Sequence, residues 1–250
     1  MKTIAIINQK GGVGKTTTAA ELGAGLVREG AKVLFIDLDP QGNLTYTLDG
    51  QRAAADVMQV LTGQTSAADA ITPIKENTSL LAAGKNLMGA DTQITAVGKE
   101  YKLKEALEGL SGFDYAIIDT PPTAGILTVN ALTASDTCLI PLQADIYSLS
   151  GLSQLYDTIK TIKRYCNNAL TISGLLLTRY NGRAVISKDL AAVLEENAQA
   201  IGTRLFNTKI RECTAIKEAQ IMRTSIFDYA PKSNGAADYT ALLQELKEVL

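Results

Sequence analysis

A glycine-rich segment near the N-terminus restricts the fold more than any other feature of this sequence. It lies between the apolar run Thr3–Ile7, which has the length of a buried strand, and a stretch whose apolar residues recur at helical spacing. The segment reads Lys10-Gly11-Gly12-Val13-Gly14-Lys15-Thr16-Thr17. Glycines between a strand and a helix let successive N–H groups approach phosphate oxygens, and the helix N-terminus adds its positive dipole end. The sequence therefore predicts a phosphate-binding loop.

Three residues of this loop have predicted chemical roles. Lys15 should reach the β- and γ-phosphates of a nucleotide, and the Thr16 hydroxyl should ligate Mg²⁺. Lys10 stands where the usual P-loop pattern begins with glycine. This second cation could lie across the phosphates of its own subunit or of a facing one, where it would stabilise transition-state charge as an arginine finger does.

Carboxylates follow two further apolar runs. Asp37 and Asp39 come at and after the end of the run Lys32–Ile36, and Asp119 follows Tyr115–Ile118. Carboxylates at the C-terminal ends of parallel strands point into the ligand crevice. We therefore expect Asp119 to hold Mg²⁺ directly or through water and Asp37 to share that role. Asp39, two residues further along, is better placed to position the attacking water.

Apolar runs alternate with amphipathic stretches along the chain, which is typical of βαβ units. The pattern predicts an α/β fold with a mostly parallel, doubly wound sheet flanked by helices, and one domain over residues 1–250. Further strands are expected at 137–142 and 171–177. Residues 41–112 are read as insertions within the same domain, with helices over 53–61 and 101–110 and a strand over 79–82. A last helix is expected over 236–250.

Composition excludes several functional classes. The 250 residues include no histidine, which removes Ser-His-Asp and Cys-His systems and zinc-protease motifs. The three cysteines are far apart, as expected for free thiols in a reducing cytosol. We see no targeting segment and no apolar run of membrane-spanning length, so we expect a soluble, cytoplasmic protein.

The net charge of −2 conceals a basic region, because residues 160–232 carry 12 Lys and Arg against six Asp and Glu. Such a region indicates an anionic partner, although ordinary solvated side chains are the alternative. If the partner is DNA, phosphate contacts would bind it without sequence preference. The candidate contacts are Arg183, Lys188, Lys209, Arg211, Lys217 and Arg223, and Arg211 could instead face the nucleotide.

Three segments together resemble the ParA/Soj branch of the P-loop ATPases. Residues 10–17 resemble its deviant Walker A box, residues 35–43 its switch segment, and residues 114–122 its Walker B box. Segments 141–145 and 218–239 also look like that family. The resemblance spans nearly the whole chain and implies a partition ATPase that uses ATP and Mg²⁺.

The resemblance also implies a reaction cycle. Lys10 would cross into the other protomer of an ATP-sandwich dimer, and Gly12 would lie at that dimer interface. Gly11 to Thr17 would bind nucleotide, and Asp39 would position the hydrolytic water. The dimer would bind double-stranded DNA non-specifically on the nucleoid, and a ParB-type partner would stimulate slow basal hydrolysis. The sequence has Ile210-Arg211-Glu212-Cys213 where many such chains have Pro-Arg-Asn, so the adenine contacts stay unassigned.

Three other functions are the alternatives to DNA partition. MinD-like relatives bind membranes through a basic amphipathic C-terminal helix, but residues 236–250 contain one lysine and three acidic residues. We therefore expect no membrane partner and assign Leu242, Leu246 and Val249 to core packing. Nitrogenase-reductase relatives need cluster-binding cysteines, and no matching motif is present. An ATPase that positions protein cargo over the nucleoid would carry the same motifs, so the sequence leaves that alternative open.

Overall fold

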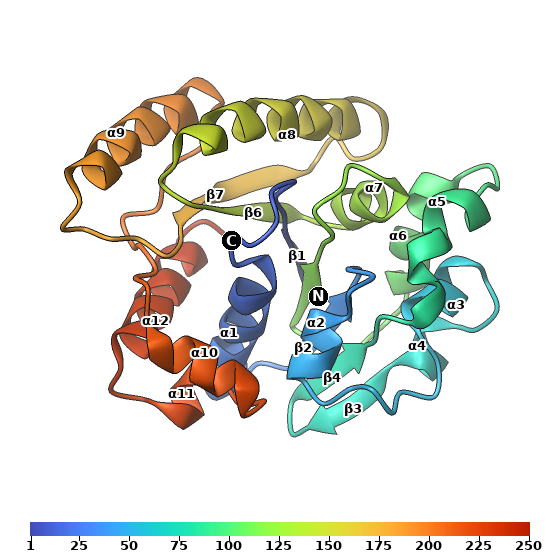
Figure 1. Cartoon of the computed structure of the whole chain (residues 1–250). Coiled ribbons are helices and arrows are strands. Elements are labelled where there is room, and N and C mark those ends of the chain that lie inside the picture. The colour runs from blue at the N-terminus through green and yellow to red at the C-terminus, as the bar shows by residue number, and fades with distance from the viewer.

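Seven strands form a single sheet with helices on both of its faces, and the computed structural model describes residues 1–250 (Figure 1). The order across the sheet is β3-β4-β2-β5-β1-β6-β7, and only β3 runs antiparallel to its neighbour. The strands are β1 Lys2–Ile6, β2 Val33–Asp37, β3 Thr72–Lys75, β4 Thr78–Leu81, β5 Tyr115–Asp119, β6 Thr137–Leu142 and β7 Thr171–Leu177. The mostly parallel, doubly wound fold is therefore confirmed.

The helices divide into two layers. The first layer, which includes α1 and α12, covers one face of the sheet, and the second layer, which includes α7 and α8, covers the other (Figure 1). The first comprises α1 Lys15–Arg28, α2 Asn43–Thr47, α10 Thr214–Ile221, α11 Ile226–Tyr229 and α12 Asn234–Lys247. The second comprises α3 Val57–Leu61, α4 Ala67–Ala70, α5 Ala90–Gln93, α6 Lys102–Leu107, α7 Ile126–Thr133, α8 Ile146–Tyr165 and α9 Val185–Ala200. Two 3₁₀ turns, η1 Lys85–Gly89 and η2 Lys99–Tyr101, complete the helical elements.

Strand β1 shows why the apolar runs lack polar alternation. Ile4 and Ile6 belong to the core on the α1 side, whereas Ala5 and Ile7 belong to the core on the α7 side. Successive side chains of a strand point to opposite faces, so a strand covered on both faces needs apolar residues at every position. All four residues are fully buried. The position of β1 between β5 and β6 places the glycine-rich segment at the middle of the sheet.

Residues 41–112 contribute two strands to the sheet as well as five short α-helices. The predicted strand over 79–82 corresponds to β4, which pairs in parallel with β2. Strand β3 was missed by the sequence analysis. Its sequence, Thr-Pro-Ile-Lys, is half exposed and contains a proline, which only an edge strand tolerates. Pairing with β4, not a local apolar pattern, makes these residues a strand.

Three predicted helices differ from the structure at their ends. The helix expected from residue 53 begins at Val57, because Asp56 and Gln59 form a capping box there. The helix expected to reach residue 110 ends at Leu107, two residues before Gly109, whose φ is 84°. The last helix begins two residues early, at Asn234, where the Ser233 side chain accepts the Ala236 N–H. Helix termini thus follow capping groups more closely than apolar spacing.

The C-terminal helix packs as the sequence predicts. Leu242 and Leu246 are fully buried against α1, and Val249 is partly buried at the same core. No helix of this chain is both long enough and apolar enough to span a bilayer.

Candidate functional site

The glycine-rich loop joins β1 to α1 and leaves the first turn of α1 without a side-chain cap. Gly12 and Gly14 have φ values of 74° and 86°, a left-handed conformation that glycine adopts without strain. Gly14 occupies the N-cap position of α1. The uncapped N–H groups of this 14-residue helix and the positive end of its dipole are suited to a phosphate group.

Lys15 curls back over the loop. It is 6% exposed, and its Nζ donates to the Lys10 carbonyl at 3.1 Å. Burial lowers the pKa of this ammonium group, while the charges of Asp119 and Asp39 act in the opposite direction. A partly desolvated cation held beside two carboxylates can release its backbone contact and pair with a phosphate.

Asp119 and Thr16 meet at the ends of β5 and the loop. The Thr16 hydroxyl donates to Asp119 Oδ2 at 2.6 Å, while the buried Asp119 Oδ1 has no hydrogen-bond partner. Burial and the neighbouring Asp37 raise the pKa of Asp119 well above its ordinary value. A buried carboxylate oxygen without a hydrogen-bond partner, next to a hydroxyl, suits a hard divalent cation. Such a cation would give the oxygen a partner and would offset the desolvation of the carboxylate charge. No group of three or more carboxylate or thiol side chains that could hold a metal ion occurs in the chain.

Asp37 lies beside Asp119 in the sheet register, but its oxygens are already occupied. Oδ2 accepts hydrogen bonds from the Thr45 N–H and hydroxyl, each at 2.7 Å, and Oδ1 accepts the Asp39 N–H at 3.1 Å. Burial raises the pKa of Asp37 to about 6. In this structure Asp37 fixes the backbone that carries Asp39. Its sharing of a metal ion, with contact through water, stays a prediction.

Asp39 lies beyond the end of β2 and is 7% exposed. Its Oδ1 accepts the Gln41 N–H at 3.0 Å. The carboxylate is close enough to Lys15 to influence the pKa of that side chain. The structure thus brings together Lys15 and Thr16 from the first turn of α1, Asp39 from the segment after β2, and Asp119 from the end of β5.

A pocket beside the loop is lined in part by residues 210–213, including Arg211, the segment for which the sequence left the adenine contacts unassigned. It is lined by Gly14 and Thr17, by Thr178 and Arg179 after β7, and by residues around α10 that include Cys213 and Gln220. Gln220 donates to the Thr17 hydroxyl at 2.7 Å, and the Thr178 hydroxyl donates to the Val13 carbonyl at 2.8 Å. Thr178 directly follows a parallel strand, so the strand-end rule that found Asp119 could also have found it.

The six cations predicted to contact DNA are not equivalent in the structure. Arg211 is held by Asp238 through its backbone N–H and its guanidinium, with Nη2 to Oδ1 at 2.6 Å. Arg223 pairs with Asp49 at 2.5 Å, and Lys217 pairs with Glu212 at 3.1 Å. Arg183, Lys188 and Lys209 form no ion pair.

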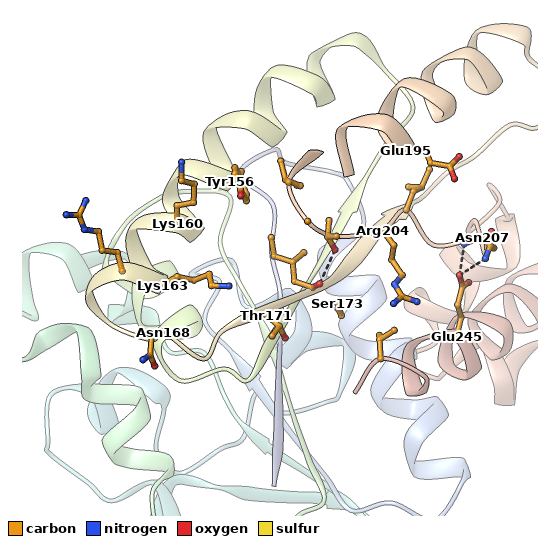
Figure 2. A pocket seen from close by; sticks show the side chains of 17 residues that line it. Tyr156, Lys160, Lys163, Asn168, Thr171, Ser173, Glu195, Arg204, Asn207 and Glu245 are labelled. Carbon is orange, nitrogen blue, oxygen red and sulfur yellow. Dashed lines mark hydrogen bonds between the residues drawn. The ribbon is translucent and has the colours of Figure 1, made fainter. Parts of the chain in front are cut away.

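Other cations of the basic region line a groove along β7, the last strand of the sheet (Figure 2). Its volume is about 1100 Å³, and Lys163 and Arg204 extend on either side of the strand segment that holds Thr171 and Ser173. Lys160, Lys163, Arg164 and Arg204 all lack an acidic partner. One of the two groove carboxylates, Glu245, is already bound to the Asn207 and Thr208 backbone N–H groups.

Comparison with known proteins agrees with this geometry. A family profile described as an AAA domain matches residues 1–172. The chain is 40% identical to the sporulation initiation inhibitor protein Soj of Bacillus subtilis over 250 residues, covering 98% of both chains. It is 34% identical to the chromosome partitioning protein ParA of Caulobacter vibrioides, covering 98% and 94% of the two chains. The chain belongs to the ParA/Soj family of partition ATPases.

A solved structure of this fold supports the same placement. Apo McdA of Cyanothece is 29% identical to this ParA/Soj chain, with a TM-score of 0.88 and coverage of 100% and 99%. A structure described as a cobyrinic acid a,c-diamide synthase from Mycobacterium smegmatis is 35% identical, has a TM-score of 0.84 and covers 98% and 93%. That protein was solved with bound ADP and magnesium.

Proposed function

We propose that this protein is a Mg²⁺-dependent ATPase that cycles between a monomer and an ATP-sandwich dimer and binds DNA without sequence preference. The observation that carries the nucleotide chemistry is the contact between Thr16 and Asp119, with a buried Asp119 oxygen left unpaired next to the P-loop. The structural neighbour that contains ADP and magnesium supports the choice of ligands.

Different residues of the site would bind the phosphates, hold Mg²⁺ and position the attacking water. The backbone N–H groups of residues 11–17 and the Lys15 ammonium would bind the phosphates. Thr16 and Asp119 would hold Mg²⁺, which supplies charge neutralisation when it is bound. Asp39 would orient the attacking water, and Asp37 keeps the Asp39 backbone in place. A water next to a single aspartate, without a stimulating partner, lacks part of the charge stabilisation of activated NTPases, so we expect slow basal turnover that a ParB-type partner raises.

Dimerisation would place two P-loops face to face. A Cβ atom added at Gly12 would meet no heavy atom within 4 Å, so this position is open on the monomer surface. That openness supports a role in close contact with a second copy, with Lys10 completing the phosphate site of the facing subunit.

DNA binding would follow from doubling the basic region. Arg183, Lys188 and Lys209, and the groove cations Lys160, Lys163, Arg164 and Arg204, are available for phosphate contacts because no acidic side chain neutralises them. Arg211, Lys217 and Arg223 would contribute less. A dimer presents two such surfaces at once, which links DNA affinity to ATP.

The test is filter binding to random duplex DNA over a salt series, with ATP and with ADP. We expect tight binding with ATP and Mg²⁺ that falls steeply with salt, and weak binding with ADP. Equal binding in both nucleotide states would contradict the coupling. Capture of a centromere-binding partner from the native host would support DNA partition, whereas capture of a cargo adaptor would replace DNA partition with cargo positioning.

A further inference from the structure

The ammonium group of Lys10 pairs with Asp145 of its own subunit. The distance from Lys10 Nζ to Asp145 Oδ2 is 2.5 Å, and the ring centroid of Tyr147 lies 6.0 Å from the same nitrogen. Asp145 is the N-cap of α8 and follows β6, the neighbour of β1 in the sheet. The pair therefore joins the P-loop to the β6–α8 connection, which follows the strand beside β1 in the sheet.

Three other hydrogen bonds fix the backbone on which this pair is built. Asn8 donates to the Pro141 carbonyl at 2.7 Å and accepts the Lys10 N–H at 2.9 Å. Gln143 donates to the Gly12 carbonyl at 3.1 Å. All three involve main-chain atoms of the loop or of β6. The Lys10 side chain is thus the part of this junction that can change its partner without moving the loop.

Asp145 can lose Lys10 without losing its structural role. Its Oδ1 accepts the Ser148 N–H at 3.0 Å and the Ser148 hydroxyl at 3.2 Å, so the helix cap uses one oxygen and the lysine uses the other. Burial acts to raise the pKa of Asp145, but hydrogen bonds from Lys10 and Ser148 outweigh it, and the pKa lies below its ordinary value. The carboxylate is therefore charged at neutral pH and holds Lys10 there.

We propose that Asp145 is a positioning residue that keeps Lys10 in its own subunit, so that ATP-dependent dimerisation must first break this ion pair. The inference rests on the proposed dimer cycle and adds a residue to it. Each subunit contains one such pair, and both must open before the two lysines can exchange. Asp145 consequently sets the protein concentration at which the dimer assembles.

The test compares three variants by sedimentation velocity over a concentration series with ATP and Mg²⁺. Asp145→Asn keeps a good N-cap but removes the charge that holds Lys10. A partly exposed ion pair of this kind changes an equilibrium by about threefold, and two pairs together give a dimer dissociation constant about tenfold lower. Asp145→Glu retains the charge and should match the wild type. Asp157→Asn makes the same charge change on the same helix at a residue that has no ion pair, and should also match.

A second readout needs no dimer. Acetylation of Lys10 in the nucleotide-free protein, followed by mass spectrometry, should be several-fold faster in Asp145→Asn than in Asp157→Asn. Unchanged Lys10 acetylation, or a dimer that is equally stable or weaker in Asp145→Asn, would overturn the role of Asp145. If the wild type and all variants stay monomeric with ATP, both the dimer cycle and the control of assembly by Asp145 are overturned. Faster acetylation would then establish only the ion pair.

Discussion

The charged side chains are buried at the carboxyl ends of the central strands, whereas those of the basic region 160–232 are exposed. At the strand ends, Lys15, Asp37, Asp39 and Asp119 are each at most 7% exposed, and their charges affect one another. In the basic region the six predicted cations are partly or fully exposed, and three of them are neutralised by nearby acids. A buried charge without a partner lowers the stability of the fold, so buried charges must lie beside groups that compensate them. Exposed charges are solvated by water, and each ion pair between them contributes little free energy.

The largest effect should come from the most buried cation of the nucleotide site. We expect Lys15→Gln to weaken ATP binding by at least about 100-fold, because Lys15 is a buried cation beside Asp39 and Asp119 that would neutralise the phosphate charge. A nucleotide-fluorescence titration measures this affinity. Lys85→Gln, in the 3₁₀ turn η1, is the matched control and should bind normally. Retained affinity in Lys15→Gln would contradict the assignment of the phosphate site.

The glycines of the chain allow a sharper test of the dimer face. Gly12→Val should block ATP-dependent dimerisation, because a branched side chain would stand between two facing loops. Gly30→Val is the control, since Gly30 also has positive φ (89°) and open space around its Cβ position but lies after α1. Both variants carry the same backbone strain of about 1–2 kcal/mol. Sedimentation with ATP should show a monomer for Gly12→Val and a dimer for Gly30→Val. A dimer in both would contradict the interface.

Glu21 extends the comparison to a buried carboxylate outside the site. It is 2% exposed and accepts the Ile226 N–H at 3.0 Å, and burial raises its pKa to about 7. The unfolded chain ionises this group near pH 4.5, so its contribution to stability is fully present below that pH and is lost as the pH rises to about 7. Glu21→Gln should therefore raise the free energy of unfolding at pH 8 by up to about 3 kcal/mol and change it little at pH 4.

Urea unfolding at both pH values measures this difference. Asp69→Asn, at an exposed residue, is the control and should leave the pH dependence unchanged. Equal stability of Glu21→Gln and the wild type at pH 8 would show that Glu21 is not desolvated in solution.

The smallest effects should come from the exposed cations. Arg204→Gln and Arg183→Gln each remove an unpaired charge, so each should reduce the slope of log affinity for DNA against log salt by about 0.9. Arg223→Gln removes a charge that Asp49 already neutralises, and its slope should change by less than half as much. Filter binding with ATP measures the three slopes. A larger change in slope for Arg223→Gln than for Arg204→Gln would show that the β7 groove is not part of the surface that binds DNA.

Local sequence was sufficient to predict the candidate nucleotide site, because its residues lie within short segments that also carry their secondary structure. Residues 137–142 and 171–177 form strands with the predicted bounds, since a strand buried on both faces needs a continuous apolar run. The segment 10–17 contains both the glycines that give the loop its conformation and the side chains that are predicted to bind phosphate and Mg²⁺. Strand β3 was missed because its short, partly exposed sequence carries no such pattern.

The sequence by itself determined the α/β class, the P-loop and the strand-end positions of Asp37 and Asp119, because period and spacing are local properties of the chain. Only the tertiary structure decided which charges are free. Arg211 meets Asp238 across 27 residues, Arg223 meets Asp49 across 174, and Lys10 meets Asp145 across 135. Ion pairs form wherever folded elements bring opposite charges within a few ångströms, and no local spacing records which acid that will be.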